Sequence, residues 1–163
     1  MTDIAAAIGL HQLRKAGRFL QKRAHLAELY SRKLADVEEI ITPVQNPNRI
    51  HSWHLYAIRL RLEKLSIDRA AVIDELKSAG IGTSVHWQPL HLHPYYRETC
   101  GCKPEDLPCA ARVYQQLISL PIYPDMTEGE VEFVCSKLKD IVARNRKELF
   151  IPSAASNLAA SVH

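Results

Sequence analysis

The chain has 163 residues, of which 47% are hydrophobic and 24% are charged, and its formal net charge is +3. This composition is typical of one folded, water-soluble domain and excludes a mainly disordered chain. The weak positive charge does not indicate a nucleic-acid-binding protein. No apolar run approaches the roughly 20 residues that cross a bilayer, so we expect neither nucleic acid nor a membrane as a partner.

The N-terminus indicates a cytoplasmic protein. It opens with Thr2 and Asp3 and not with the basic segment and apolar core of a signal peptide. In the reducing cytoplasm the four cysteines are expected to form no disulfides. Cys100 and Cys102 have no evident neighbouring base that would lower a thiol pKa, so we interpret them as surface cysteines.

Residues 1–41 are predicted to form a long linking helix. Apolar residues recur at three- and four-residue steps from Ile4 to about Val37 without a proline, and Thr2 is the expected N-cap. The first turns, Ile4–Leu10, are apolar nearly all round, which predicts a missing partner or self-association. Basic residues at four-residue spacing are interpreted as a solvated face and less readily as a phosphate-binding track; they are Arg14, Arg18 and Lys22.

A small α+β domain is predicted over residues 42–145. Its first strand is expected at His51–Leu62, where alternation makes His54 and Tyr56 core positions. The next elements expected along the chain are a helix over residues 66–79 closed by Gly80, a short strand at Ile81–Trp87 and an ordered, proline-containing loop at Gln88–Tyr96.

The second half of this domain is predicted to carry two helices and an edge strand. A mobile polar stretch precedes a helix from Pro108 to about Ile118, and Ser119–Pro124 has the prolines that an edge strand tolerates. Thr127 is expected to cap the last helix, whose buried stripe is Val131, Val134, Leu138 and Ile141. Residues 146–163 are expected to be a disordered tail. The predicted fold class is α+β, with a long N-terminal helix followed by a small, mainly antiparallel sheet packed with helices.

The densest cluster of polar and aromatic side chains lies between His86 and Tyr96. One interpretation is a metal site of His86, His91 and His93 with Cys100 and Cys102, but the spacing fits no zinc signature and no acidic residue lies between the histidines. A second is ligand recognition, because aromatic faces stack on flat rings and imidazoles bond hydroxyls and phosphates. A third is a packed loop whose histidines bond to the backbone.

Four separated motifs together carry a resemblance to a known family. They are Met1–Leu10 with Gln12-Leu13; Ser52–Tyr56; Gly80–Trp87 with Pro89–His91 and Pro94–Tyr96; and Ser119–Pro124 with Thr127. In order and spacing they resemble the C-terminal part of the DegT-type sugar aminotransferases over about residues 1–145. The resemblance implies the C-terminal domain of a fold-type-I, pyridoxal-phosphate-dependent enzyme. Such an enzyme moves an amino group from glutamate to a nucleotide-linked keto-sugar and works as a dimer.

The departure from the family pattern is also informative. The family's Schiff-base lysine and phosphate-binding residues belong to a large domain that does not precede Met1 here. We therefore expect pyridoxal phosphate in the intact family, no cofactor on this chain alone, and no catalytic, cofactor-binding or metal-binding residue within it. The resemblance places His86, Trp87, His91 and Tyr95 on a cleft-lining loop, where they would contact the nucleotide-sugar substrate.

These features predict a C-terminal fragment that is inactive alone and associates with its missing large domain or with a second copy. One alternative is a non-catalytic subunit that regulates or completes another protein by docking the exposed helix. The other is a small metal-binding module built on the loop from His86 to His93.

Overall fold

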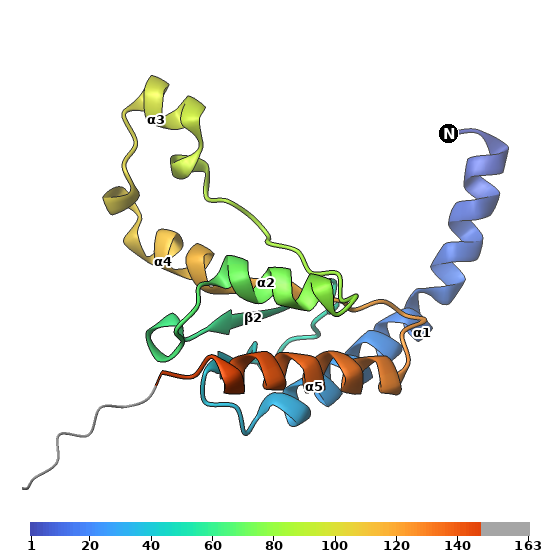
Figure 1. The fold of residues 1–163 in the computed structure, drawn as a ribbon. Helices are drawn as coiled ribbons and strands as arrows, with labels where there is room; N and C mark the ends of the chain where they lie inside the picture. The colour runs from blue at the N-terminus through green and yellow to red at the C-terminus, as the bar shows by residue number, and fades with distance from the viewer. Residues whose placement is uncertain (148–163) are drawn as a thin grey trace, which may run out of the picture.

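The computed structural model describes residues 1–147. Five α-helices, three short 3-10 helices (η) and three strands follow one another in these residues (Figure 1): α1 Asp3–Leu34, β1 Ile40–Ile41, β2 Tyr56–Leu60, η1 Leu62–Lys64, α2 Arg69–Ser78, η2 Leu90–Leu92, α3 Pro94–Cys100, η3 Pro104–Asp106, α4 Pro108–Gln116, β3 Leu117–Leu120 and α5 Glu128–Arg144. The predicted fold class is confirmed: a long N-terminal helix precedes a small antiparallel sheet packed with helices. Within these residues, no helix is both long and apolar enough to span a membrane.

Helix α1 has a packed half and a free half. Thr2 caps it as predicted, with its hydroxyl accepting a hydrogen bond from the amide of Ala5 at 3.3 Å. The C-terminal half packs in the core through the buried residues Leu26, Ala27, Leu29, Tyr30 and Leu34. The N-terminal half extends away from the body (Figure 1), and Ile4 is 75% exposed. The exposed apolar start is therefore confirmed, while self-association stays a prediction. The basic stripe is also exposed, as expected of a solvated face.

The sheet has the order β1-β2-β3, with both pairings antiparallel. Tyr56 pairs with Leu120 and Ile58 with Ile118, so the central strand fixes the register of β3. Helix α5 packs against both the packed half of α1 and α2, and α2 also contacts β3 (Figure 1). The rings of Tyr30 and Tyr56 stack at 4.8 Å between α1 and β2. The core therefore forms between the sheet and the three helices α1, α2 and α5.

The strand predicted at His51–Leu62 is shorter than expected. Tyr56 is a core residue as predicted, but the prediction for His54 is wrong, because His54 is exposed and precedes β2. Before the strand, the chain turns at Trp53, whose φ is +50°. The amide of Trp53 donates to Nδ1 of His51 at 2.9 Å, so this backbone group bonds locally and not across a sheet.

The segment Ile81–Trp87 is not the predicted strand. Only Ser84 pairs, in an isolated antiparallel bridge with Ser119 that has N···O distances of 3.1 and 2.8 Å. The predicted loop at Gln88–Tyr96 contains η2 and the start of α3, and the polar stretch expected to be mobile contains the end of α3 and η3.

The elements after this stretch begin or end a few residues from their predicted positions. The strand expected at Ser119–Pro124 lies at Leu117–Leu120, and it ends before Pro121 because proline has no amide hydrogen for a ladder. The helix predicted to reach Ile118 accordingly ends at Gln116.

Of the two remaining helices, α2 begins at Arg69, three residues later than predicted, and α5 has its predicted cap. Asp68 caps α2 by accepting from the amide of Ala71 at 2.9 Å, and Gly80 follows this helix with a φ of +78°, a conformation that favours glycine. Thr127 and Glu130 form a capping box on α5, and the predicted apolar stripe of that helix is buried. Arg146 then pairs with Leu65 in an antiparallel bridge. The rest of the predicted tail, 148–163, lies outside the described residues.

Candidate functional site

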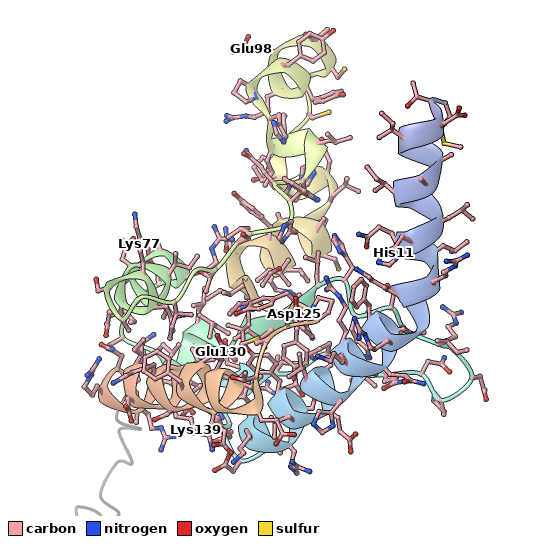
Figure 2. All side chains as sticks on the ribbon, turned by 90° about the vertical axis from the view of Figure 1, so that its right-hand side faces the viewer. His11, Lys77, Glu98, Asp125, Glu130 and Lys139 are labelled. Carbon is pink, nitrogen blue, oxygen red and sulfur yellow. The ribbon has the colours of Figure 1, made fainter. Side chains whose placement is uncertain are left out.

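Residues 85–107, here called the arm, leave the sheet after Ser84 and return to it through α4. Figure 1 shows the arm rising from the body with α3 near its tip, on the same side as the free half of α1. Figure 2, turned by 90°, again shows both extending upward from the body. The arm contains all four residues that the sequence predicts to contact a substrate.

The root of the arm is held by the edge strand. Ser84 and Ser119 exchange two backbone hydrogen bonds, and two residues later Nδ1 of His86 lies 2.9 Å from the hydroxyl of Ser119. Ser119 is only 4% exposed, whereas His86 is partly exposed. The imidazole of His86 is therefore anchored to the sheet at one nitrogen.

Two aromatic side chains of the arm face solvent. Trp87 is 78% exposed, and its ring meets that of His86 edge to face at 4.9 Å. Tyr95 is exposed on α3, with its ring edge-to-face against Tyr96 at 5.3 Å. Large apolar rings in water offer surfaces on which a flat or sugar-like ring can stack.

The other histidines of the arm differ from His86. His91 is only 6% exposed, and neither of its ring nitrogens has a hydrogen-bond partner among residues 1–147. Nε2 of His93 contacts the backbone carbonyl of Gln88 at 3.2 Å, and the side-chain Nε2 of Gln88 donates to the carbonyl of Leu92 at 3.1 Å. The loop thus has exposed rings at its root and on α3, with one buried histidine and one backbone-bonded histidine between them.

The described residues do not assemble a metal site or a pyridoxal-phosphate site. Among residues 1–147, no three His, Cys, Asp or Glu side chains converge in a way that could hold a metal ion. No lysine in the same range is buried, whereas a Schiff-base lysine must be held over an enclosed cofactor. Three lysines are already paired with carboxylates: Lys33 with Glu132, Lys64 with Glu38 and Lys139 with Asp36. Residues 1–147 therefore offer no enclosed lysine of the kind that holds this cofactor.

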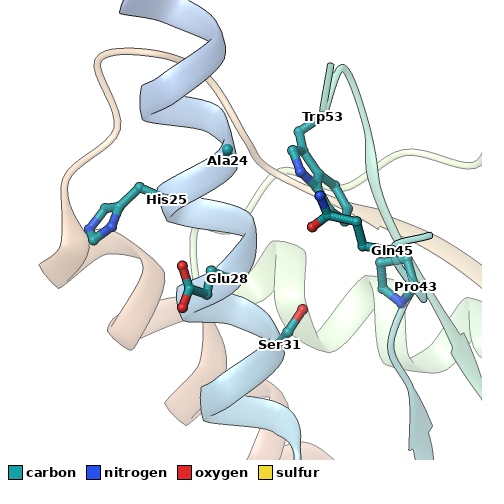
Figure 3. Close-up of a pocket in the computed structure, with 7 residues that line it drawn as sticks. All are labelled: Ala24, His25, Glu28, Ser31, Pro43, Gln45 and Trp53. Carbon is teal, nitrogen blue, oxygen red and sulfur yellow. The ribbon is translucent and has the colours of Figure 1, made fainter. Parts of the chain in front are cut away.

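A hollow of about 550 Å³ lies elsewhere, between α1 and the segment that joins β1 to β2. Figure 3 shows its lining: Ala24, His25, Glu28, Ser31, Pro43, Gln45 and Trp53. Two of its polar groups are already bonded, because Ser31 shares a hydrogen bond with the hydroxyl of Tyr56 at 2.8 Å and His25 contacts Glu128 at 2.7 Å. None of the four predicted site residues lines this hollow, so it is not the candidate site.

Sequence reasoning missed one residue that holds the root of the arm and one that holds the segment before β2. Ser119 was interpreted only as the start of an edge strand, and its hydroxyl meets His86 through the tertiary fold. In the sequence, Arg23 is only the residue that follows Lys22 of the basic stripe. One terminal nitrogen of its guanidinium donates to the carbonyls of Trp53, His54 and Ile122 at 3.0, 3.2 and 3.1 Å. The sequence signal for Ser119 is its place in the Ser119–Pro124 motif; nothing local distinguishes Arg23 from its basic neighbours.

Comparison with known proteins identifies the same family as the motifs. A 146-residue alignment with the uncharacterized protein MJ1066 of Methanocaldococcus jannaschii is 47% identical and covers 90% of this chain. The spore coat polysaccharide biosynthesis protein SpsC of Bacillus subtilis is 38% identical over 87% of the chain. Among solved structures, the PMP form of the sugar aminotransferase Spr1654 from Streptococcus pneumoniae superposes with a TM-score of 0.80 at 30% identity over 88% of this chain.

The chain corresponds to only part of these proteins. It spans 38% of the length of the first relative, 37% of the second and 36% of the solved structure. The model of the DegT/DnrJ/EryC1/StrS aminotransferase family matches residues 1–139, which is most of the chain. Together with the α+β fold, this match shows that the chain belongs to the DegT/DnrJ/EryC1/StrS aminotransferase family.

Proposed function

We propose that this chain is the substrate-facing C-terminal domain of a pyridoxal-phosphate-dependent sugar aminotransferase. In the intact enzyme it helps to transfer an amino group from glutamate to a nucleotide-linked keto-sugar, in the cytoplasm and as a dimer. The observation that carries the proposal is the exposure of Trp87 and Tyr95 on the arm, in a chain of this family. Solved structures of Spr1654 in PLP and PMP forms support the cofactor of the intact enzyme.

The arm residues have binding roles in this proposal. Trp87 and Tyr95 present ring faces to the base or sugar of the substrate, and His86 bonds one of its oxygens. His91 is buried, so it shapes the arm from within and reaches a ligand only if the arm rearranges. We assign no acid or base role to these residues, and the lysine that binds the cofactor is attributed to the part of the relatives that this chain does not match.

A chimera tests the proposal. Residues 1–147 replace the matching segment of the Bacillus subtilis relative, and mass spectrometry follows the amino product formed from glutamate and a nucleotide-linked keto-sugar. We expect the chimera to transfer the amino group. We expect Trp87→Ala or Tyr95→Ala to raise the KM for the keto-sugar about tenfold, since each removes one aromatic contact of about 1 kcal/mol or more. Phe133→Ala is the control, because Phe133 is exposed on α5, away from the arm.

Two outcomes count against the proposal. One is a folded chimera that binds the cofactor but transfers no amino group from glutamate to any nucleotide-linked keto-sugar. The other is a chimera in which Trp87→Ala and Tyr95→Ala change KM no more than Phe133→Ala does. For a chimera that does not fold, nuclear magnetic resonance of the chain itself supplies a second measurement: adding a nucleotide sugar should shift the signals of Trp87 and Tyr95 and leave those of Phe133 in place.

The chain by itself is expected to be inactive. Because no lysine in residues 1–147 is buried, added pyridoxal phosphate should give no saturable absorbance band near the edge of the visible range. A band that disappears when one particular lysine is changed would contradict this expectation. It would also favour a chain that is catalytic without the rest of the family's sequence.

A further inference from the structure

We propose that Ser119 is a positioning residue: its buried hydroxyl donates to Nδ1 of His86 and so presents Nε2–H of the imidazole to an oxygen of the substrate. The inference rests on the proposed function for the identity of that substrate. The hydrogen bond between Ser119 and the imidazole of His86 rests only on geometry within this chain. The two parts can therefore be tested separately.

The hydroxyl of Ser119 is fixed from two sides. In the sheet Ser119 pairs with Ala57 of β2, and on its other side it exchanges backbone hydrogen bonds with Ser84 at 3.1 and 2.8 Å. The residue is 4% exposed, so its side chain has little freedom to rotate toward water. The 2.9 Å contact with Nδ1 therefore holds one atom of the His86 ring at a set place at the root of the arm.

The direction of this hydrogen bond follows from the proton count. A serine hydroxyl has one hydrogen, and among residues 1–147 the only hydrogen-bond partner of the Ser119 hydroxyl is Nδ1 of His86. If Nδ1 carried a proton and donated, the buried hydroxyl hydrogen would have no acceptor, which costs about 1–3 kcal/mol. The hydroxyl therefore donates, Nδ1 accepts, and the neutral ring carries its hydrogen on Nε2.

The hydrogen on Nε2 is available to a ligand. Nε2 of His86 has no partner in the described part of the chain, and it is not enclosed in the way the nitrogens of His91 are. Trp87, exposed and edge-to-face against this ring, lies beside it. A fixed N–H donor next to an open aromatic surface suits a ligand that combines a stackable ring with phosphate or hydroxyl oxygens, which is the chemistry of a nucleotide sugar.

The first arm of the experiment measures the tautomer in the chain itself. Long-range proton–nitrogen correlation spectra of the nitrogen-15-labelled protein distinguish Nδ1–H from Nε2–H for each of the eight histidines. The signals that are lost in the variant His86→Gln are assigned to the ring of His86. We expect Nε2–H in the wild type, a mixture of tautomers in Ser119→Ala, and restored Nε2–H in Ser119→Thr, whose branched side chain suits a strand. Ser84→Ala is the matched control, because Ser84 meets Ser119 only through the backbone.

A wild-type ring protonated on Nδ1 would overturn the assignment, as would a Ser119→Ala ring unchanged from the wild type. The circular dichroism spectrum shows that the variants fold. Retention of the Nε2–H signal in Ser119→Thr separates a hydrogen-bonding role from simple packing.

The second arm measures substrate recognition in the chimera described above. Ser119→Ala should raise KM for the nucleotide-linked keto-sugar about tenfold, the effect of losing one oriented hydrogen bond, with a smaller change in kcat. Ser119→Thr should restore KM, and Ser84→Ala should leave it unchanged. If the His86 tautomer changes as expected in the Ser119 variants but the KM for the keto-sugar does not, the ligand assignment is overturned. The hydrogen bond between Ser119 and His86 is then still supported. If the chimera transfers no amino group at all, the proposed function fails instead.

Discussion

Arg146 contacts both carboxylate oxygens of Glu39, with its Nε 2.6 Å from Oε1 and a terminal nitrogen donating to Oε2 at 3.0 Å. The side chain of Glu39 is 2% exposed, whereas that of Arg146 is 57% exposed. The hydrogen bond with this carboxylate raises the pKa of Arg146 above its ordinary value, so the guanidinium stays charged. This pair joins the residue that precedes β1 to the segment that follows α5.

The first prediction is that Arg146→Ala lowers the midpoint of thermal unfolding more than Arg144→Ala does. Removing Arg146 leaves a buried carboxylate unpaired, whereas the partner of Arg144 is Glu75, which is partly exposed and can be hydrated. Thermal melts followed by circular dichroism compare the two variants. Equal midpoints would show that Glu39 is hydrated once its partner is gone.

The second prediction concerns the hydrogen bond between Tyr56 and Ser31. Burial raises the pKa of Tyr56 to about 12, so its hydroxyl stays protonated at neutral pH and bonds Ser31 at 2.8 Å. Tyr56→Phe should lower the free energy of unfolding by about 0.5–1.5 kcal/mol. Urea titrations of Tyr56→Phe, Ser31→Ala and the double variant give the interaction free energy between the two hydroxyls. Strictly additive changes in the free energy of unfolding would mean that the hydrogen bond between the two hydroxyls does not stabilise the fold.

The third prediction is a loss of stability at high pH caused by Cys135. Burial raises the pKa of this thiol from 9.0 to about 11. Between these values the unfolded chain binds fewer protons than the folded one, so the stabilisation is complete below pH 9 and is lost as the pH rises through 11. Urea titrations at both pH values should show a steeper loss for the wild type than for Cys135→Ala. Parallel losses would assign the alkaline transition to other groups, such as Tyr30, whose pKa is also raised by burial.

The fourth prediction is self-association through the free half of α1. Ile4 and Ile8 are exposed, and burying a large apolar side chain stabilises by roughly 1.5–3 kcal/mol. The double variant Ile4→Glu and Ile8→Glu should weaken association in light scattering without changing the circular dichroism of the body. The control is Val44→Glu with Ile50→Glu, which adds the same charge at exposed positions outside the helices. A wild-type chain that is monomeric at high concentration would contradict the prediction.

The elements that local chemistry dictates could be predicted from the sequence. Thr2 and Thr127 cap their helices as predicted, because a short oxygen-bearing side chain satisfies amides that no helix can satisfy internally. The buried stripe of α5 follows from the helical period alone. The four motifs also sufficed for the family.

Strand limits and site contacts could not be predicted in this way. Ile81–Trp87 has the composition of a strand, but only Ser84 finds a partner, since the chain then leaves the sheet to form the arm. His54 alternates with Tyr56 in the sequence, but the turn at Trp53 precedes the strand and leaves the imidazole in water. A strand exists only where another strand offers its hydrogen-bonding groups, and a sequence does not show where that partner lies.

The sequence by itself therefore determined the α+β class, the helix caps, the exposed apolar start of α1 and the family, because each depends on local periodicity or on residue order. Only the tertiary structure decided which predicted site residues face solvent and which neighbours hold them. His86 and His91 look alike in the sequence, but Ser119, 33 residues after His86, anchors one ring at a partly open position. The other ring is enclosed by the packing of the arm. Burial and long-range hydrogen bonds depend on where distant segments meet, and that is a property of the folded chain.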